Sequence, residues 1–131
     1  MKSALNGTVT LDGRTYRVDC GLVSDAPSDH GWLHKAKYVA IESEGHTDIL
    51  LFPRSTEHAE FAHNFVRANG GTVVAGGFVD FDSRDRLIQA YGRSMSLDMP
   101  SRPIDTQVLQ AFVDSLKTRF APQTPNNYGT P

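Results

Sequence analysis

An amphipathic segment near the end of the chain constrains the fold most strongly. Between Asp105 and Phe120 the apolar residues recur every three or four positions, which is the spacing of one face of an α-helix. This apolar stripe consists of Val108, Leu109, Phe112, Val113, Leu116 and Phe120. Lys117 and Arg119 follow near the predicted C-terminus, where the helix dipole favours cations. The segment is therefore predicted to be a helix with one side packed against a core.

Strand-like segments and turn residues alternate through the rest of the chain. Residues 8–11 and 14–18 flank Asp12-Gly13, a dipeptide typical of a two-residue β-hairpin turn. The other predicted strands are residues 37–41 and 48–52 around Glu44-Gly45, residues 72–75 and 78–81 around Gly76-Gly77, and residues 87–91.

A second helix is predicted between these strands, over residues 57–69. Ser55 or Thr56 is the expected N-cap, and Gly70-Gly71 ends the helix in the left-handed conformation. Its apolar residues at helical spacing are Phe61, Ala62, Phe65, Val66 and Ala68. The order of strands, helix, strands and helix indicates an α+β protein, with a mixed, mostly antiparallel sheet packed with two main helices.

Length and composition narrow the class of protein. The 131 residues are expected to form one domain, and a net charge of -2 gives no broad attraction to nucleic acid or to a membrane. Cys20 is the only cysteine, which excludes an intramolecular disulfide and a cysteine-rich metal site. The sequence lacks an apolar run of about 18 residues and an N-terminal signal-peptide pattern, so we expect a cytoplasmic protein.

The segment after the last predicted strand combines several features of an anion site. Gly92 allows successive backbone N–H groups to point into one concavity. Ser94 and Ser96 would add hydroxyl donors. Arg93 or Arg102 would add a planar guanidinium that suits phosphate oxygens. The same residues also fit a plain loop, in which serines bond their own backbone and arginines are solvated.

Among the five histidines, His58 is the strongest candidate for a catalytic residue. It falls in the first turn of the predicted helix 57–69, where free N–H groups attract anions and the dipole favours neutral imidazole. His63 is five residues further, rotated by about 140° at 100° per residue, so it faces elsewhere. This spacing does not indicate a zinc site. The remaining histidines, expected in solvated loops or turns, are His30, His34 and His46.

Three stretches resemble the protein histidine phosphatase (phosphohistidine phosphatase) and Janus family. Residues 37–41, Lys-Tyr-Val-Ala-Ile, are similar to the family's Lys-Tyr-Val strand. Residues 58–61, His-Ala-Glu-Phe, are similar to its His-Ala-Asp-Ile at a helix start. Gly-Gly-Phe-Val at 76–79, followed by Gly-Arg-Ser-Met-Ser at 92–96, resembles its Gly-Gly strand and Tyr-Gly-x-Ser-Met-Ala loop. The resemblance covers roughly residues 22–116.

The resemblance implies the phosphohistidine phosphatase fold and a phosphatase that acts on a phosphoramidate, such as phosphohistidine or phospholysine, without a metal or other cofactor. His58 would be the catalytic base or phosphoryl acceptor. The expected phosphate-binding residues are Lys37, Ala59, Arg93, Ser94, Met95, Ser96 and Arg102. The domain would span residues 22–120, with residues 1–21 as an N-terminal hairpin extension and residues 121–131 as a disordered tail.

Two departures from the family pattern leave other functions open. Glu57 occupies the position of an aromatic residue, and residues 97–103 replace a glycine-rich segment that contains histidine. Both departures favour a non-catalytic binder of a phosphorylated small molecule or nucleotide. A small interaction domain without a ligand is the third alternative. The expected partner is a phosphorylated protein or a phosphorylated small molecule, with no nucleic acid and no membrane.

Overall fold

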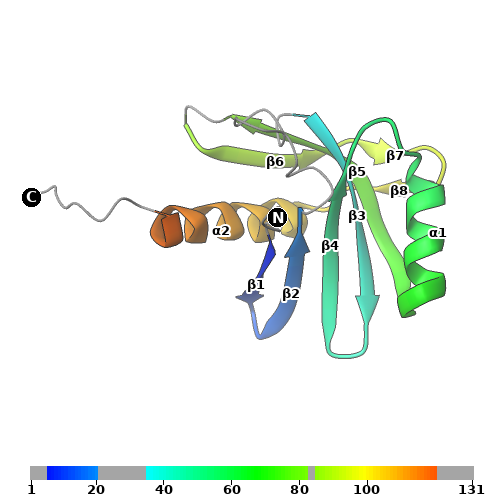
Figure 1. The fold of residues 1–131 in the computed structure, drawn as a ribbon, viewed down its shortest axis with the longest axis horizontal. Helices are drawn as coiled ribbons and strands as arrows, with labels where there is room; N and C mark the ends of the chain where they lie inside the picture. Colours follow the sequence, from blue (N-terminus) through cyan, green and yellow to red (C-terminus); the bar gives the residue numbers. More distant parts are fainter. Residues whose placement is uncertain (1–5, 21–34, 83–84, 121–131) are drawn as a thin grey trace, which may run out of the picture.

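One curled sheet with a helix on each face forms the protein in its computed structural model, which describes residues 6–20, 35–82 and 85–120 (Figure 1). The predicted tail at residues 121–131 and the expected loop or turn residues His30 and His34 lie outside the described residues. The elements in chain order are β1 (Asn6–Leu11), β2 (Arg14–Asp19), β3 (Lys35–Ser43), β4 (His46–Phe52), α1 (His58–Asn69), β5 (Thr72–Asp82), β6 (Leu87–Tyr91), β7 (Arg93–Ser94), β8 (Met99–Pro100) and α2 (Pro103–Phe120).

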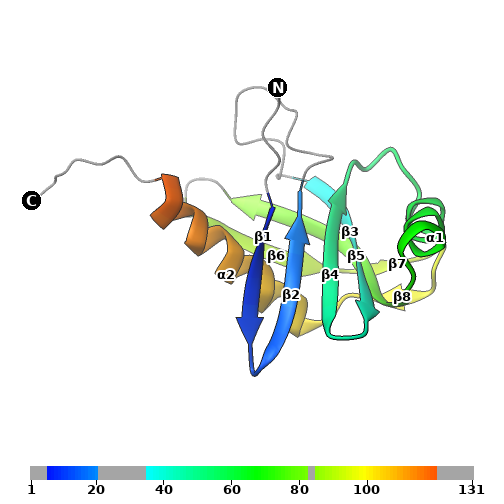
Figure 2. The same cartoon turned by 60° about the horizontal axis from the view of Figure 1, so that its bottom comes forward.

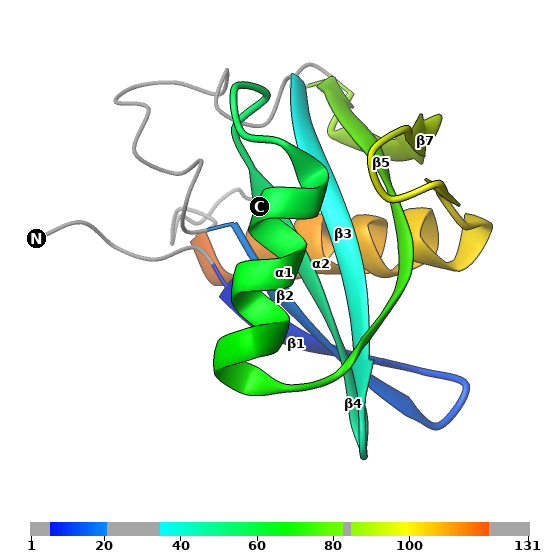
Figure 3. The ribbon, with the colours of Figure 1, turned by 90° about the vertical axis from the view of Figure 1, so that its right-hand side faces the viewer.

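The main sheet has the strand order β1-β2-β4-β3-β5-β6, and β7 and β8 form a separate two-stranded sheet. Every neighbouring pair in the main sheet is antiparallel except β2 and β4, which are parallel. Figure 3 shows α1 in front of the sheet and α2 behind it. The prediction of an α+β protein with a mixed, mostly antiparallel sheet and two helices is confirmed.

Each helix covers its own apolar core. The core beneath α1 contains Val39, Ile41, Leu50, Phe52 and Ala62. The larger core beneath α2 contains the buried residues of its apolar stripe, which are Val108, Leu109, Phe112, Val113 and Leu116. These residues confirm the predicted stripe, while the side chain of its last member, Phe120, lies outside the described part of the chain.

The first hairpin belongs to the same core as the rest of the sheet. Its turn has positive φ angles at Asp12 (52°) and Gly13 (76°), as the sequence predicts for a two-residue turn. Val9, Tyr16 and Val18 point into the core beneath α2. The predicted boundary at residue 21 therefore does not separate two independent cores.

Two local predictions were wrong. The N-cap of α1 is Glu57 rather than Ser55 or Thr56, and it makes no side-chain cap hydrogen bond. Gly76 and Gly77 do not divide two strands, because β5 runs continuously from Thr72 to Asp82.

Close backbone approach explains why glycine occupies the middle of β5. A Cβ atom at Gly77 would lie 2.5 Å from the carbonyl oxygen of Tyr91 and 3.4 Å from that of Gly92. A Cβ atom at Gly76 would lie 3.2 Å from the Cβ of Ser94. Glycine in a strand interior commonly marks such an approach. The two glycines thus bring the chain that follows β6 against β5.

We expect Gly77→Ala to destabilise the fold, because its Cβ would meet a backbone oxygen that no side-chain rotation can move. The cost should be about 1–3 kcal/mol, typical of overpacking, measured by urea unfolding. Gly76→Ala is the matched control, since its Cβ would lie 3.2 Å from its nearest neighbour instead of 2.5 Å, and it should cost less. Equal stability of Gly77→Ala and the parent would show that β5 and the loop are not in close contact.

Candidate functional site

The residues predicted around the phosphoryl site come from separate parts of the fold. His58 begins α1, Lys37 lies on β3, and Ser94 ends β7. A side chain at Gly76 would touch both Ser94 and His58, since its Cβ would lie 3.2 Å from the Cβ of Ser94 and 3.7 Å from the Cδ2 of His58. The middle of β5 therefore lies between His58 and the loop that contains Ser94 and Ser96, which we call the serine loop.

His58 is held in one orientation. Its residue is 4% exposed, and its Nε2 lies 2.7 Å from the carbonyl oxygen of Gly77. Because a carbonyl oxygen only accepts, Nε2 must carry a proton, and in the neutral ring Nδ1 keeps its lone pair. The rings of Phe52 and Phe78 each meet the imidazole edge-on, with centroids 5.5 Å away. The sequence did not indicate the role of Gly77 as the acceptor.

Burial lowers the pKa of His58 below its ordinary value of 6.5. The hydrogen bond to the Gly77 carbonyl opposes this shift, the charge of Lys37 adds to it, and the charge of Glu57 opposes it. The net direction is downward, so the imidazole is neutral at neutral pH. A neutral imidazole with a free lone pair is the form that acts as a nucleophile or base.

Lys37 lies on the same face of the sheet as α1. It is opposite Phe52 of β4 and Phe78 of β5, which contact His58. Its Nζ donates a hydrogen bond of 2.7 Å to the carbonyl oxygen of Thr56, two residues before α1 begins. The ammonium group thus lies beside the helix N-terminus and keeps two further N–H donors.

The serine loop is fixed to the N-terminus of α1. The Ser96 hydroxyl oxygen accepts a hydrogen bond of 3.1 Å from the backbone N–H of Ala59. Ser94 is fully buried, and its hydroxyl oxygen accepts a hydrogen bond of 3.1 Å from the N–H of Leu97. Each hydroxyl group accepts in these contacts, so its own proton remains available for donation. Gly92, with φ at 72°, begins the loop as predicted.

Arg93 and Met95 point away from a buried site. The Arg93 guanidinium pairs with the carboxylate of Asp98, and both side chains are substantially exposed. Met95 is 83% exposed. Their side chains therefore form the outer surface of the loop, and a binding role for Met95 would involve its backbone.

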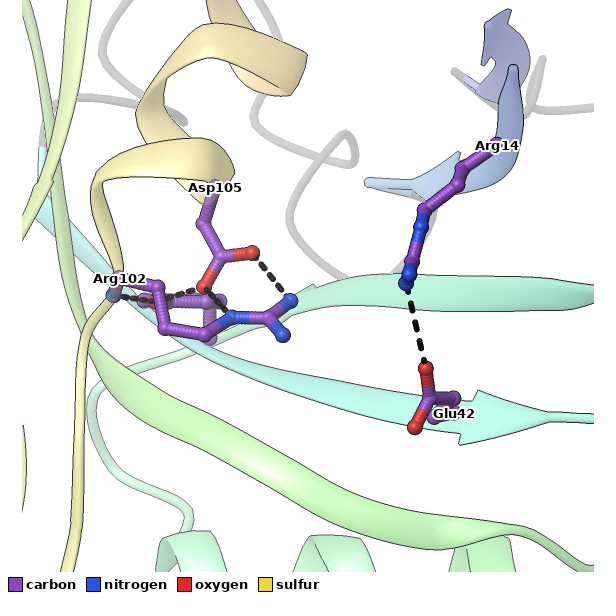
Figure 4. Close-up of polar contacts among 5 residues, drawn as sticks. Arg14, Glu42, Arg102 and Asp105 are labelled. Carbon is purple, nitrogen blue, oxygen red and sulfur yellow. Dashed lines mark hydrogen bonds and ion pairs between the residues drawn. The ribbon is translucent and has the colours of Figure 1, made fainter. Parts of the chain in front are cut away.

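Arg102 is separated from the other candidates. Its Nε and Nη2 donate hydrogen bonds of 3.1 and 2.7 Å to the two carboxylate oxygens of the buried Asp105, as Figure 4 shows. The Tyr38 hydroxyl donates to the same carboxylate at 2.6 Å. Tyr38 belongs to the core beneath α2, and its neighbour Lys37 faces α1 because side chains alternate along a strand. We therefore do not assign Arg102 to the phosphoryl site.

Phe78, which contacts His58, also lies against a cation and a second aromatic ring. The guanidinium carbon of Arg54 lies 5.1 Å from the centre of the Phe78 ring. Phe78 also contacts Tyr91, with ring centroids 5.9 Å apart. The pairing of Phe78 with Lys37 across β3 and β5 explains this location, and that pairing cannot be read from the local sequence.

Comparisons with known proteins add no identification. No family model, no curated protein and no solved structure matches this chain. Within residues 6–20, 35–82 and 85–120, no group of three or more histidine, cysteine or acidic side chains is arranged to hold a metal ion. Neither helix of the described chain combines the length and the apolar character needed to cross a membrane.

The lowered pKa of His58 predicts a dependence of stability on pH. Below pH 6.5 the unfolded chain binds a proton at this residue that the folded protein does not, so the free energy of unfolding should fall as the pH drops from 6.5 towards the folded pKa. Urea unfolding at a series of pH values measures this slope. His58→Gln should reduce it, because it removes the titrating imidazole. If His58→Gln had the same slope as the parent, the pH dependence would not come from His58.

Proposed function

We propose that this protein is a phosphatase that acts on a phosphoramidate, such as phosphohistidine or phospholysine, and that it has the phosphohistidine phosphatase fold. The observation that carries the proposal is the hydrogen bond between His58 and the Gly77 carbonyl. It leaves Nδ1 as the basic nitrogen of a buried neutral imidazole. The helix N-terminus, Lys37 and Ser96 supply the donors for a phosphoryl group next to it.

In the nucleophilic route, Nδ1 of His58 forms a bond to phosphorus while the P–N bond of the substrate breaks. The leaving nitrogen takes a proton from solvent, and water then cleaves the phosphoryl group from the histidine as phosphate. In the alternative route, Nδ1 removes a proton from the water that attacks phosphorus. The substrate P–N bond is already labile, so neither route requires a metal.

Lys37 and the loop stabilise the charge of the transferred group. The ammonium group of Lys37 offers its remaining N–H donors to the equatorial oxygens. The Ser96 hydroxyl, oriented by the N–H of Ala59, donates its proton to another oxygen. Ser94 shapes the loop through its bond to Leu97 and has a structural role in this scheme. These groups come from a strand, a helix and a loop that the close approach at Gly76 and Gly77 holds together.

A non-catalytic binder of a phosphorylated ligand is the second candidate. Two observations favour it: the carboxylate of Glu57 lies at the N-cap of α1, and the N–H of Ala59 is already bonded to Ser96. A binder would use the same donors but would not release phosphate. Turnover therefore separates the two functions, and anion binding is common to both.

Replacement of His58 tests catalysis. The residue is buried between two aromatic rings, so His58→Ala would leave a cavity, and His58→Gln is the better variant. Glutamine keeps an N–H donor for the Gly77 carbonyl but lacks the basic nitrogen. We expect His58→Gln to remain folded and to lose at least about 10²-fold in phosphate release from a phosphohistidine peptide.

His63→Gln is the control, because His63 is exposed further along α1, and it should retain parental turnover. A His58→Gln protein with parental turnover would exclude His58 as nucleophile or base. A parent that binds phosphate analogues without turnover would establish the binder instead.

Replacement of Lys37 tests the anion site independently of turnover. Lys37→Met removes one charge-assisted donor and should weaken tungstate binding by about tenfold in calorimetry. Lys35→Met is the matched control, because Lys35 lies two residues earlier on the same strand and the same face, where it is exposed. If both variants bind tungstate as the parent does, the anion site lies elsewhere.

A further inference from the structure

The two edge strands of the main sheet differ in whether other described residues bind their outer backbone groups. The sheet ends at β6 on one side and at β1 on the other. An unpaired edge strand exposes a row of backbone N–H and C=O groups that can pair with another strand. Whether these groups already have partners therefore decides where a further chain can add to the sheet.

Side chains of α2 occupy the edge at β6. The backbone N–H of Ala90 donates to the Thr106 hydroxyl at 2.9 Å, and this hydroxyl donates to the Ala90 carbonyl at 3.2 Å. The N–H of Ile88 donates to the Gln110 side-chain oxygen at 3.0 Å, and the Gln110 amide donates to the Arg86 carbonyl at 3.0 Å. Thr106 and Gln110, four residues apart on α2, thus replace a neighbouring strand.

The edge at β1 has no such cover among the described residues. A two-residue turn makes its flanking pair, Leu11 and Arg14, a hydrogen-bonded pair, and the pairs then alternate along the hairpin. The outward-pointing N–H and C=O groups of β1 therefore belong to Asn6, Thr8 and Thr10. None of these groups has a hydrogen bond to the described part of the chain.

The sequence of β1 also lacks the usual protection of an edge strand. Natural edges carry charged residues, proline or a bulge, whereas β1 reads Asn-Gly-Thr-Val-Thr-Leu and pairs with β2 in unbroken register. Figure 2 shows that α2 crosses behind β1 and continues beyond this edge of the sheet. An added strand would thus meet backbone groups that have no partner among the described residues, with a helix behind it.

A second copy of β1 fits this edge. When two copies run antiparallel with Thr8 opposite Thr8, the pairs on either side are Asn6 opposite Thr10 and Thr10 opposite Asn6. All three pairs use the outward backbone groups, and on the face of α1 they place polar side chains opposite one another, where threonine pairs are favourable. On the other face, Val9 lies opposite Gly7, so the larger side chain meets the smaller one. No charged side chain opposes another of the same sign.

We propose that this chain forms a homodimer through antiparallel pairing of β1 with β1, centred on Thr8. The two-fold axis is perpendicular to the joined sheet, so both copies of α2 lie on the same face of a continuous sheet of twelve strands, six from each copy. β2, β4 and β3 separate β1 from β5, so the pairing lies away from His58 and the residues around it in both copies. The dimer is therefore independent of the proposed phosphatase activity.

Sedimentation and light scattering of the full chain, from low micromolar to submillimolar protein, test the dimer. The parent should approach twice the 14.4 kDa mass of one chain as concentration rises. Thr8→Lys places two like charges opposite each other at the centre of the pairing, and Thr8→Pro removes an outward N–H that β2 does not use. Both variants should lose the dimer. Thr15→Lys is the control, with the same charge on the same face one strand inward, and it should remain dimeric.

Cross-linking tests the register. Opposed residues of a hydrogen-bonded antiparallel pair have Cα atoms about 5.5 Å apart, which is within disulfide range. Thr8→Cys should therefore form a covalent dimer on mild oxidation, whereas Thr10→Cys should not, because its two copies are four residues apart along the pairing. The buried Cys20 serves as an internal reference in both proteins. A monomeric parent at every concentration, or a dimer that survives both Thr8 substitutions, would overturn the proposal, and cross-linking at Thr10 instead of Thr8 would overturn the register.

Discussion

The hydrogen bond between His58 and the Gly77 carbonyl is the contact on which the candidate site depends. It joins the start of α1 to the middle of β5, and it fixes which imidazole nitrogen carries the proton. At the same residue β5 approaches its neighbours closely, since a Cβ atom at Gly77 would lie 2.5 Å from the Tyr91 carbonyl oxygen. The same missing side chains that allow the strands to pack also bring the serine loop, through Ser94, beside the histidine. Packing and chemistry are therefore set by the same two residues.

Side chains alternate between the two faces of the sheet along β3, so neighbouring residues belong to different networks. Lys37 faces α1 and binds the Thr56 carbonyl beside the helix N-terminus, whereas Tyr38 faces α2 and binds the buried carboxylate of Asp105. Arg102 completes the second network, and an ion pair between Arg14 and Glu42 at 3.8 Å links the first hairpin to β3 nearby (Figure 4). A buried carboxylate needs such partners, because an unpaired buried charge is costly. The guanidinium that composition suggests for an anion site thus stabilises the junction of β3 with α2.

The sequence was sufficient where the determining interactions are local. The turn at Asp12-Gly13 depends on its own two residues, and the stripe of α2 depends on helical spacing, so both were predicted correctly. The predictions failed where the structure depends on contacts between segments that are far apart in the sequence. The glycines of β5 were taken for a strand break, although their role is contact with Tyr91 and Ser94. The face on which Arg102 lies, and the acceptor that orients His58, depend on pairings between strands that are far apart in the chain.

Glu57 is the departure from the family pattern that would most directly oppose phosphoryl binding, because its carboxylate repels an anion. The size of this repulsion can be limited from its exposure. Its carboxylate is on an exposed residue, where water screens it, and two charges 4 Å apart in water interact by about 1 kcal/mol. A repulsion of this size would weaken the binding of a dianionic group by about fivefold per charge contact, and Lys37 would offer an attraction of similar origin. Burial, rather than either charge, is the largest influence on the pKa of His58 and keeps the imidazole neutral. In the proposed site Glu57 would therefore affect how tightly an anion is held, while the basic nitrogen of His58 depends on the Gly77 carbonyl and on the aromatic rings around it.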